Sequence, residues 1–155
     1  MLDFLPCHIV AYLYLLSAVL GAVLGSGLNC LCFRLARGQG WSGGARSACV
    51  HCGHSLSAWD LIPVVSFLAL RGRCRYCGKG LSRRYLLTEL LLSLVFVSLL
   101  WRYALSLELI PPAVLCCCLF CLSLVDLDTF IIPDRFLVIP AICRAAELLI
   151  TGGFK

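Results

Sequence analysis

Residues 9–33 form a run of 25 residues without a charged side chain. A helix needs about 20 apolar residues to cross the hydrocarbon of a bilayer, so this run is long enough to span a membrane. A cleaved signal peptide is the competing interpretation. The residues before the run contain no Lys or Arg and do contain Asp3, and the run is longer than the apolar region of a signal peptide, which argues against cleavage.

Three further apolar blocks occur at residues 85–100, 110–125 and 130–150. Pro111 and Pro112 suit the first turn of a helix, whereas charges interrupt the last block, which would cross only when packed against other helices. The chain is 61% hydrophobic and only 14% charged, which excludes an ordinary soluble domain. The sequence predicts an all-α polytopic membrane protein with about four transmembrane helices.

The segment between the first two predicted spans, residues 34–84, is strongly basic. It carries nine Lys or Arg and one acid, Asp60, and such an excess retains a short loop in the cytoplasm. We therefore expect a cytoplasmic loop, a periplasmic N-terminus and a return of the chain to the cytoplasmic surface at residues 126–135. Topology and the lipid bilayer account for these charges, so we expect no nucleic-acid partner.

This loop also contains two Cys-x-x-Cys-Gly motifs, whose cysteines are Cys49, Cys52, Cys74 and Cys77. Four thiolates in a reducing compartment favour tetrahedral zinc. Metal binding supplies on the order of 10 kcal/mol of folding free energy to small zinc peptides, which suits a loop with few large apolar side chains. Gly53 and Gly78 can adopt the backbone angles of a tight turn around the metal. The expected organisation is an N-terminal helix (1–33), a zinc-ribbon-like loop (34–84) and a membrane part with three helices (85–155).

Four alternatives to a structural zinc site with four cysteine ligands are a redox Cys-x-x-Cys pair, replacement of one sulfur by His51 or His54, a catalytic zinc, and two disulfides. A redox motif usually occurs singly, a catalytic zinc needs an open coordination position, and a reducing compartment disfavours disulfides. The other cysteines lie mostly in apolar surroundings and are expected to pack as small hydrophobic side chains: Cys7, Cys30, Cys32, Cys116, Cys117, Cys118, Cys121 and Cys143.

Carboxylates at the predicted inner surface form a second candidate site. Asp126, Asp128 and Asp134 lie at or just inside the interface, where ionisable groups are costly unless they are solvated or functional. Asp126 and Asp128 are two residues apart and do not face each other on a helix. Glu89, one turn into the second span, can reach the cytoplasmic edge, pair with a neighbouring arginine or point into a site.

Five blocks of this sequence, in this order and spacing, closely resemble the prepilin peptidases, which are inner-membrane aspartic proteases of type IV pili and type II secretion. The resemblance covers nearly the whole chain and is closest to a short, C-terminally truncated member of the leader peptidase subgroup. The blocks are GSGLNCLCFRL at residues 25–35, the paired cysteine motifs, WDLIPVVSFLALRGRCRYCG at 59–78, SRRYLLTELL at 82–91 and LVDLDTFIIPD at 124–134.

The resemblance implies an enzyme that removes the short leader from prepilins or pseudopilins at the cytoplasmic face. It further implies N-methylation of the new N-terminal residue with S-adenosyl-L-methionine, and it associates the zinc loop with members that perform both reactions. The first catalytic aspartate of the family falls on Asp126. Asp128, Pro133 and Asp134 match the rest of that block and are expected to shape the site.

The family's second catalytic aspartate lies in a Gly-x-Gly-Asp motif, which does not occur between residues 134 and 155. Aspartic proteolysis needs two carboxylates that share a proton. The alternative expectation is therefore a proteolytically inactive relative that acts as a zinc-containing membrane binding or assembly module. The candidates for the missing partner are Asp128, Asp134, Glu89, Glu147 and the Asp126 of a second copy in a homodimer.

Overall fold

The computed structural model describes residues 6–36 and 47–129, together with Val138, Ala141, Ile142, Ala145 and Leu148. Its elements are α1 (Cys7–Ala36), η1 (Ala58–Leu61), α2 (Val65–Ala69), α3 (Arg83–Tyr103), η2 (Leu107–Leu109) and α4 (Ile110–Thr129). The described chain is mostly helical and contains no strand, and α1, α3 and α4 are each long and apolar enough to cross a membrane. The predicted helical membrane fold is confirmed for these three spans.

Local sequence determines where the spanning helices begin. The Ser82 hydroxyl caps α3 by accepting a hydrogen bond from the Arg84 backbone N–H at 3.3 Å. Pro111 and Pro112 follow the first residue of α4, where a missing N–H costs nothing. The predicted fourth span, residues 130–150, lies outside the described residues apart from the five isolated positions, each of which is helical and exposed.

Helix α1 packs most extensively against α3, and two glycines allow the close contact. A Cβ atom at Gly21 would lie 2.6 Å from the Leu92 carbonyl oxygen, and one at Gly25 would lie 3.0 Å from that of Thr88. One turn further on, the buried Asn29 amide donates to the Thr88 hydroxyl at 3.4 Å. Hydropathy alone does not predict this contact, whereas the Gly-x-x-x-Gly pattern at residues 21–25 indicates it.

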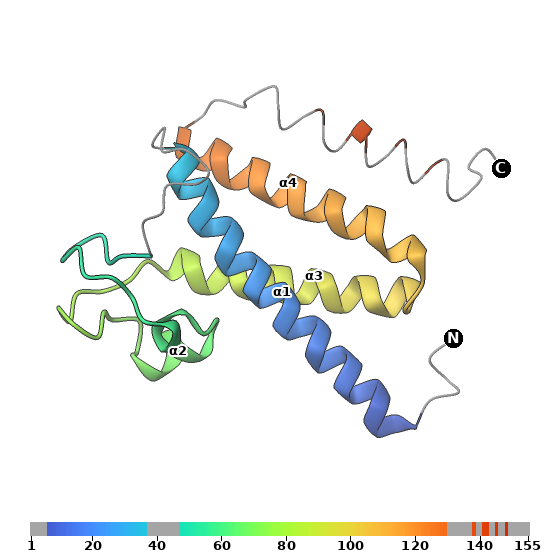
Figure 1. Cartoon of the computed structure of the whole chain (residues 1–155), viewed down its shortest axis with the longest axis horizontal. Coiled ribbons are helices and arrows are strands. Elements are labelled where there is room, and N and C mark those ends of the chain that lie inside the picture. The colour runs from blue at the N-terminus through green and yellow to red at the C-terminus, as the bar shows by residue number, and fades with distance from the viewer. Residues whose placement is uncertain are drawn as a thin grey trace.

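Helix α4 packs against the C-terminal part of α1. Cys32 is fully buried against Cys121, Leu124 and Val125, and the Cys32 and Cys121 sulfur atoms are 2.7 Å apart. These two cysteines pack as the sequence predicts. Figure 1 shows that the C-terminal ends of α1 and α4 lie together, whereas the N-terminus of α1 lies at the opposite end.

The polar segment between α1 and α3 folds around the two cysteine motifs and the short elements η1 and α2. It lies beside the beginning of α3, as the green part of Figure 1 shows. A hydrogen bond fixes it to the membrane helices: the backbone N–H of Val64 donates to the Glu89 carboxylate at 2.7 Å. Val64 has a φ of 62°, which is strained for a β-branched residue.

Candidate functional site

The two cysteine motifs form turns with the same hydrogen-bond pattern. In the first, the Gly53 N–H donates to the Cys49 carbonyl oxygen at 2.9 Å, and the Cys49 N–H donates to that of His54 at 3.0 Å. In the second, the Gly78 N–H donates to the Cys74 carbonyl oxygen at 2.9 Å, and the Cys74 N–H donates to the Lys79 carbonyl oxygen at 2.9 Å. The local backbone is therefore repeated, although only the cysteines and glycines recur in sequence.

The glycine after each motif has the conformation that the sequence predicts. Gly53 and Gly78 both have a φ of 69°, in the region that glycine adopts without a steric penalty. No atom lies within 4 Å of a Cβ built at either position, so backbone strain alone disfavours other residues there. Each glycine turns the chain back after its pair of cysteines.

The four loop cysteines converge in space. The sulfur atoms of Cys49, Cys52, Cys74 and Cys77 all lie within 4.8 Å of one another, and those of Cys49 and Cys77 are 3.9 Å apart. Tetrahedral zinc with Zn–S bonds of about 2.3 Å places its sulfur ligands about 3.8 Å apart. The cluster therefore fits a four-coordinate zinc ion. None of the eleven cysteines within the described chain forms a disulfide.

Backbone donors favour ionisation of this cluster. The N–H groups of His51 and Cys52 lower the pKa of Cys49 to about 6. The Lys79 N–H acts in the same direction on Cys77, but desolvation and the neighbouring thiols outweigh it and raise the pKa of Cys77 to about 11. Four sulfurs this close become fully ionised only around a cation, and a divalent metal supplies that charge.

Two histidines lie close to the cluster but are not part of it. The His54 ring lies against the Tyr76 ring, with centroids 3.7 Å apart, and His51 lines a neighbouring pocket. In the part of the chain that the structure describes, the group of side chains able to hold a metal consists of the four cysteines.

The predicted acidic residues lie at the C-terminal end of α4. Asp126 is half-buried, and neither a hydrogen bond nor an ion pair to its carboxylate is found among the described residues. Asp128 pairs instead with Arg84 of α3, whose guanidinium donates to both carboxylate oxygens, one of them at 2.9 Å, and to the Leu124 carbonyl oxygen at 3.2 Å. Pro133, Asp134 and Glu147 lie outside the described residues.

The Arg84–Asp128 pair was not expected from the sequence. The available signal is a pair of opposite charges at the beginning of α3 and the end of α4, two consecutive spanning helices. Because Arg84 donates to both oxygens of Asp128, this carboxylate acts as an ion-pair partner, whereas no partner of the Asp126 carboxylate is found among the described residues.

Glu89 is the third acidic side chain singled out by the sequence, and it points inward. Its residue is only 6% exposed, and its carboxylate accepts the Val64 N–H. The structure thus shows neither a pairing with Arg83 or Arg84 nor an extension to the membrane edge. Of the predicted alternatives, it agrees with a side chain that points into a site.

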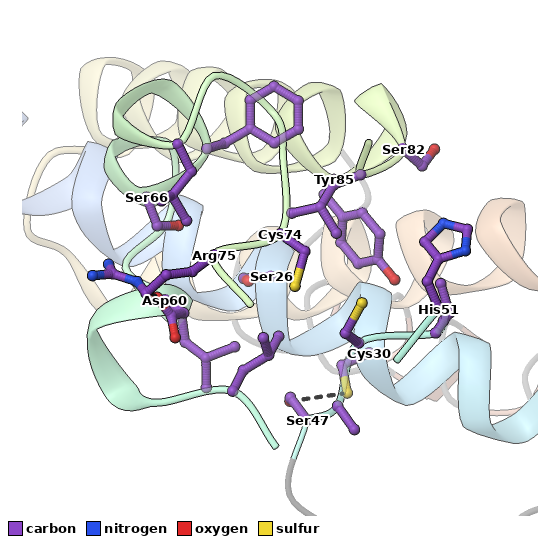
Figure 2. A pocket seen from close by; sticks show the side chains of 18 of the residues that line it. Ser26, Cys30, Ser47, His51, Asp60, Ser66, Cys74, Arg75, Ser82 and Tyr85 are labelled. Atoms are coloured by element: carbon purple, nitrogen blue, oxygen red, sulfur yellow. Dashed lines mark hydrogen bonds and ion pairs between the residues drawn. The ribbon is translucent and has the colours of Figure 1, made fainter. Parts of the chain in front are cut away.

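Glu89 borders a pocket of about 800 Å³ between α1, the loop and α3. Figure 2 looks into this pocket, with Cys30 on α1, Tyr85 on α3, and Asp60 beside Arg75 on the loop. Cys49 and Cys74 form part of its wall, so the metal cluster adjoins the pocket. The size lies within the range of about 300–1,000 Å³ that is usual for small-molecule sites.

The sequence matches the family described as the bacterial peptidase A24 N-terminal domain over residues 19–103, more than half of the chain. The matched segment contains the four-cysteine cluster and every described residue of the pocket, whereas Asp126 lies beyond it. No solved structure matches the chain.

Curated relatives support the same relationship. A protein of Myxococcus xanthus named prepilin leader peptidase/N-methyltransferase is 44% identical over 74% of this chain and 34% of its own length. Proteins of the same name from Pseudomonas putida and Neisseria gonorrhoeae are 35% and 32% identical over 85% and 90% of this chain. The chain spans only 53% and 56% of those two relatives. By its helical membrane fold, its cysteine cluster and these matches, the chain belongs to the bacterial peptidase A24 family.

Proposed function

We propose that this protein is a leader peptidase and N-methyltransferase of the bacterial inner membrane, acting on prepilins or pseudopilins in pilus assembly or type II secretion. The observation that carries the proposal is the match of the chain, across its cysteine loop and spanning helices, to relatives that bear this name. Asp126 lies in the last turn of α4, and this end of α4 lies at the same end of the helices as the loop (Figure 1), which supports the proposal.

The four-cysteine cluster is proposed to hold one structural zinc ion. Four protein ligands leave no open position for a reacting water, so the metal would stabilise the loop rather than perform chemistry. The nine basic residues of segment 34–84 support a cytoplasmic loop and a periplasmic N-terminus. In that orientation the loop and Asp126 face the compartment in which a prepilin leader is made.

Asp126 is proposed as one carboxylate of the peptidase dyad. In such a dyad one ionised carboxylate activates water, while a protonated partner polarises the scissile carbonyl. Among the other described carboxylates, Asp128 is paired with Arg84 and Asp60 is paired with Arg75. Glu89 accepts the Val64 N–H beside the loop, and Glu108 lies in η2, before the beginning of α4. The second carboxylate of the dyad would therefore come from residues outside those described or from a second copy of the chain.

Methylation would follow cleavage, with S-adenosylmethionine as the methyl donor. The lone pair of the new N-terminal amine forms a bond to the methyl carbon while the carbon–sulfur bond breaks. The electron pair of the broken carbon–sulfur bond would stay on the sulfur atom of the donor. The methylated ammonium group would then release a proton to water. This step needs a site for the donor close to the inner surface.

The peptidase proposal is tested with membranes that contain the full chain and a prepilin with an intact basic leader. The wild-type chain should cut the precursor, and Asp126→Asn should lower the rate by at least about 10³-fold, because the remaining carboxylate cannot activate water alone. Asp128→Asn should lower it less, since that change frees Arg84 but leaves the reacting acid in place. Cleavage is read as the mobility shift of the pilin on a gel.

The matched control is Glu108→Gln, which changes an exposed carboxylate in η2, far along the chain from α4's last turn. Its cleavage rate should equal that of the wild type. A wild-type chain that binds the precursor but leaves it uncut would contradict the peptidase proposal and favour the binding or assembly module.

A further inference from the structure

We propose that the pocket between α1, the loop and α3 binds S-adenosylmethionine, with the buried Glu89 carboxylate as the counter-charge of this cationic nucleoside. The inference rests on the proposed methyltransferase function and names the place at which its donor binds. It requires a cavity of suitable size, an uncompensated buried charge and apolar walls for a flat heterocycle.

The pocket is built by three parts of the chain: the C-terminal half of α1, the loop and the beginning of α3. Helix α1 contributes Ser26, the loop contributes Ser66, and α3 contributes Tyr85 and Glu89. All of these residues lie within the segment that matches the family's N-terminal domain. The proposed peptidase carboxylate, Asp126, lies outside it, so the two reactions would use separate sites in one molecule.

Glu89 is a buried acidic residue for which no ion-pair partner is found among the described residues. Only 6% of the residue is exposed, and the hydrogen bond found to its carboxylate is the neutral one from the Val64 N–H. A buried carboxylate is costly unless a positive charge accompanies it. The described basic side chains that line the same pocket are Arg34, His51 and Arg75, and Arg75 pairs with Asp60.

The other carboxylate among the described lining residues shows the contrast. Asp60 accepts hydrogen bonds from Ser57, Arg75 and Tyr76, and its ion pair with Arg75 has a nitrogen–oxygen distance of 2.7 Å. Asp60 therefore has its charge compensated by the loop itself. Glu89 is buried, but no cationic side chain of the described chain is found to pair with it as Arg75 pairs with Asp60. A cationic ligand would supply the missing positive charge.

The remaining wall suits the rest of such a ligand. Phe33 of α1, Phe67 of α2 and Tyr85 of α3 contribute aromatic surface to the pocket, and aromatic faces attract both cations and flat heterocycles. S-adenosylmethionine combines a sulfonium and an ammonium group with an adenine ring. Transfer of the methyl group leaves a neutral sulfur, so attraction to Glu89 falls and the product can leave.

The test measures equilibrium binding of S-adenosylmethionine and of S-adenosylhomocysteine, its neutral-sulfur product, to the full metal-loaded chain in detergent. Glu89→Gln keeps the shape and the acceptor for Val64 but removes the charge. This variant should weaken the binding of S-adenosylmethionine at least about tenfold. The binding of S-adenosylhomocysteine should weaken by clearly less. Glu108→Gln, the same change at an exposed site, should leave both affinities unchanged.

A second variant tests the cavity without altering charge. Ser66→Phe places a ring in the pocket and should weaken both ligands to a similar extent. Zinc content and the unfolding midpoint of each variant show that the protein is folded. Wild-type affinity in both Glu89→Gln and Ser66→Phe would overturn the assignment of the pocket.

Methyl transfer to a peptide with a free N-terminal Phe separates this inference from the proposed function. If the wild type transfers methyl groups and both variants bind the donor normally, the function stands and the pocket assignment is wrong. If the wild type neither binds the donor nor transfers methyl groups, both are wrong. A loss of affinity for the peptide alone in Glu89→Gln would also overturn the inference, because the pocket would then hold the amine substrate.

Discussion

At the scale of single residues, charge compensation distinguishes structural acids from candidate functional ones. Asp128 and Asp60 each have an arginine partner, whereas Asp126 and Glu89 have none among the described residues. The Arg84 and Asp128 side chains are 30% and 23% exposed. A partly shielded bidentate pair of this kind contributes more than an exposed ion pair and less than a fully buried one.

Removal of Arg84 should therefore separate α3 from the end of α4. Arg84→Gln is expected to lower the free energy of unfolding by about 1–2 kcal/mol, because Asp128 and the Leu124 carbonyl oxygen lose their donor. Arg102→Gln, at an exposed position at the other end of α3, should change it by less than about 0.5 kcal/mol. Unfolding in mixed detergent micelles with increasing SDS measures both, and equal effects would contradict a specific ion pair.

Asp60 makes the stability of the loop depend on pH, and the direction of this dependence follows from the shift of its pKa. The Ser57 hydroxyl, the Ser57 N–H and Arg75 lower the pKa of Asp60 below 3.8. The contribution of Asp60 to stability is therefore fully present at a pH above its pKa in the unfolded chain. It is lost as the pH falls through the lower pKa that Asp60 has in the folded protein. The melting temperature of the wild type should exceed that of Asp60→Asn at pH 7, and the difference should shrink as the pH falls below about 4. A difference that grew on acidification would contradict this sign.

At the scale of elements, helix contacts depend on small side chains rather than on hydropathy. Residues 9–33 are recognisable as a span because no charge interrupts them, but that pattern does not say which face meets α3. The face is set by Gly21 and Gly25, where backbone approaches backbone. Helix packing in lipid gains little from the hydrophobic effect, so close contact and hydrogen bonds such as that from Asn29 to Thr88 decide it.

Substitution of one interface glycine should push the two helices apart. Gly21→Ala places a Cβ 2.6 Å from the Leu92 carbonyl oxygen and is expected to destabilise the protein by about 1–3 kcal/mol. Gly27→Ala is the matched control, since no atom lies within 4 Å of its Cβ, and it should be neutral or slightly stabilising. The same SDS titration compares the two, and equal midpoints would contradict the proposed contact.

The sequence was sufficient for features that depend on spacing and insufficient for those that depend on three-dimensional contacts. The helical spans, the convergence of Cys49, Cys52, Cys74 and Cys77 and the turn at Gly53 follow from local patterns, and the structure confirms them. The Arg84–Asp128 pair and the Val64–Glu89 bond join residues 44 and 25 positions apart. Such contacts depend on how helices and loop pack, which a single sequence does not specify.

At the scale of the whole molecule, a bundle of apolar helices carries a polar loop that is organised around sulfur. The two parts draw their stability from different sources: the helices from contacts such as that between Gly21 and Leu92, the loop from its cysteine cluster. We therefore expect the loop to respond to metal removal much more strongly than the helices.

A chelator should remove about one zinc ion per chain and unfold the loop. Trypsin should then cut at Arg71, Arg73, Arg75 and Lys79, while helix content measured by circular dichroism falls only slightly. The double variant Cys49→Ser, Cys74→Ser should behave like the chelated wild type without treatment. Purified protein without metal, or a loop that stays resistant to trypsin after chelation, would contradict the assignment.

The shared construction of the pocket has a practical consequence for inhibitor discovery. Its walls come from the loop, from the C-terminal half of α1 and from the beginning of α3, and the Val64–Glu89 bond joins the loop to α3. A soluble fragment cut at residues 47 and 82 would keep its four sulfurs but lose Ser26, Tyr85 and Glu89. Compound screens on such a fragment would miss every binder that needs this carboxylate, so the whole chain in nanodiscs is the appropriate target.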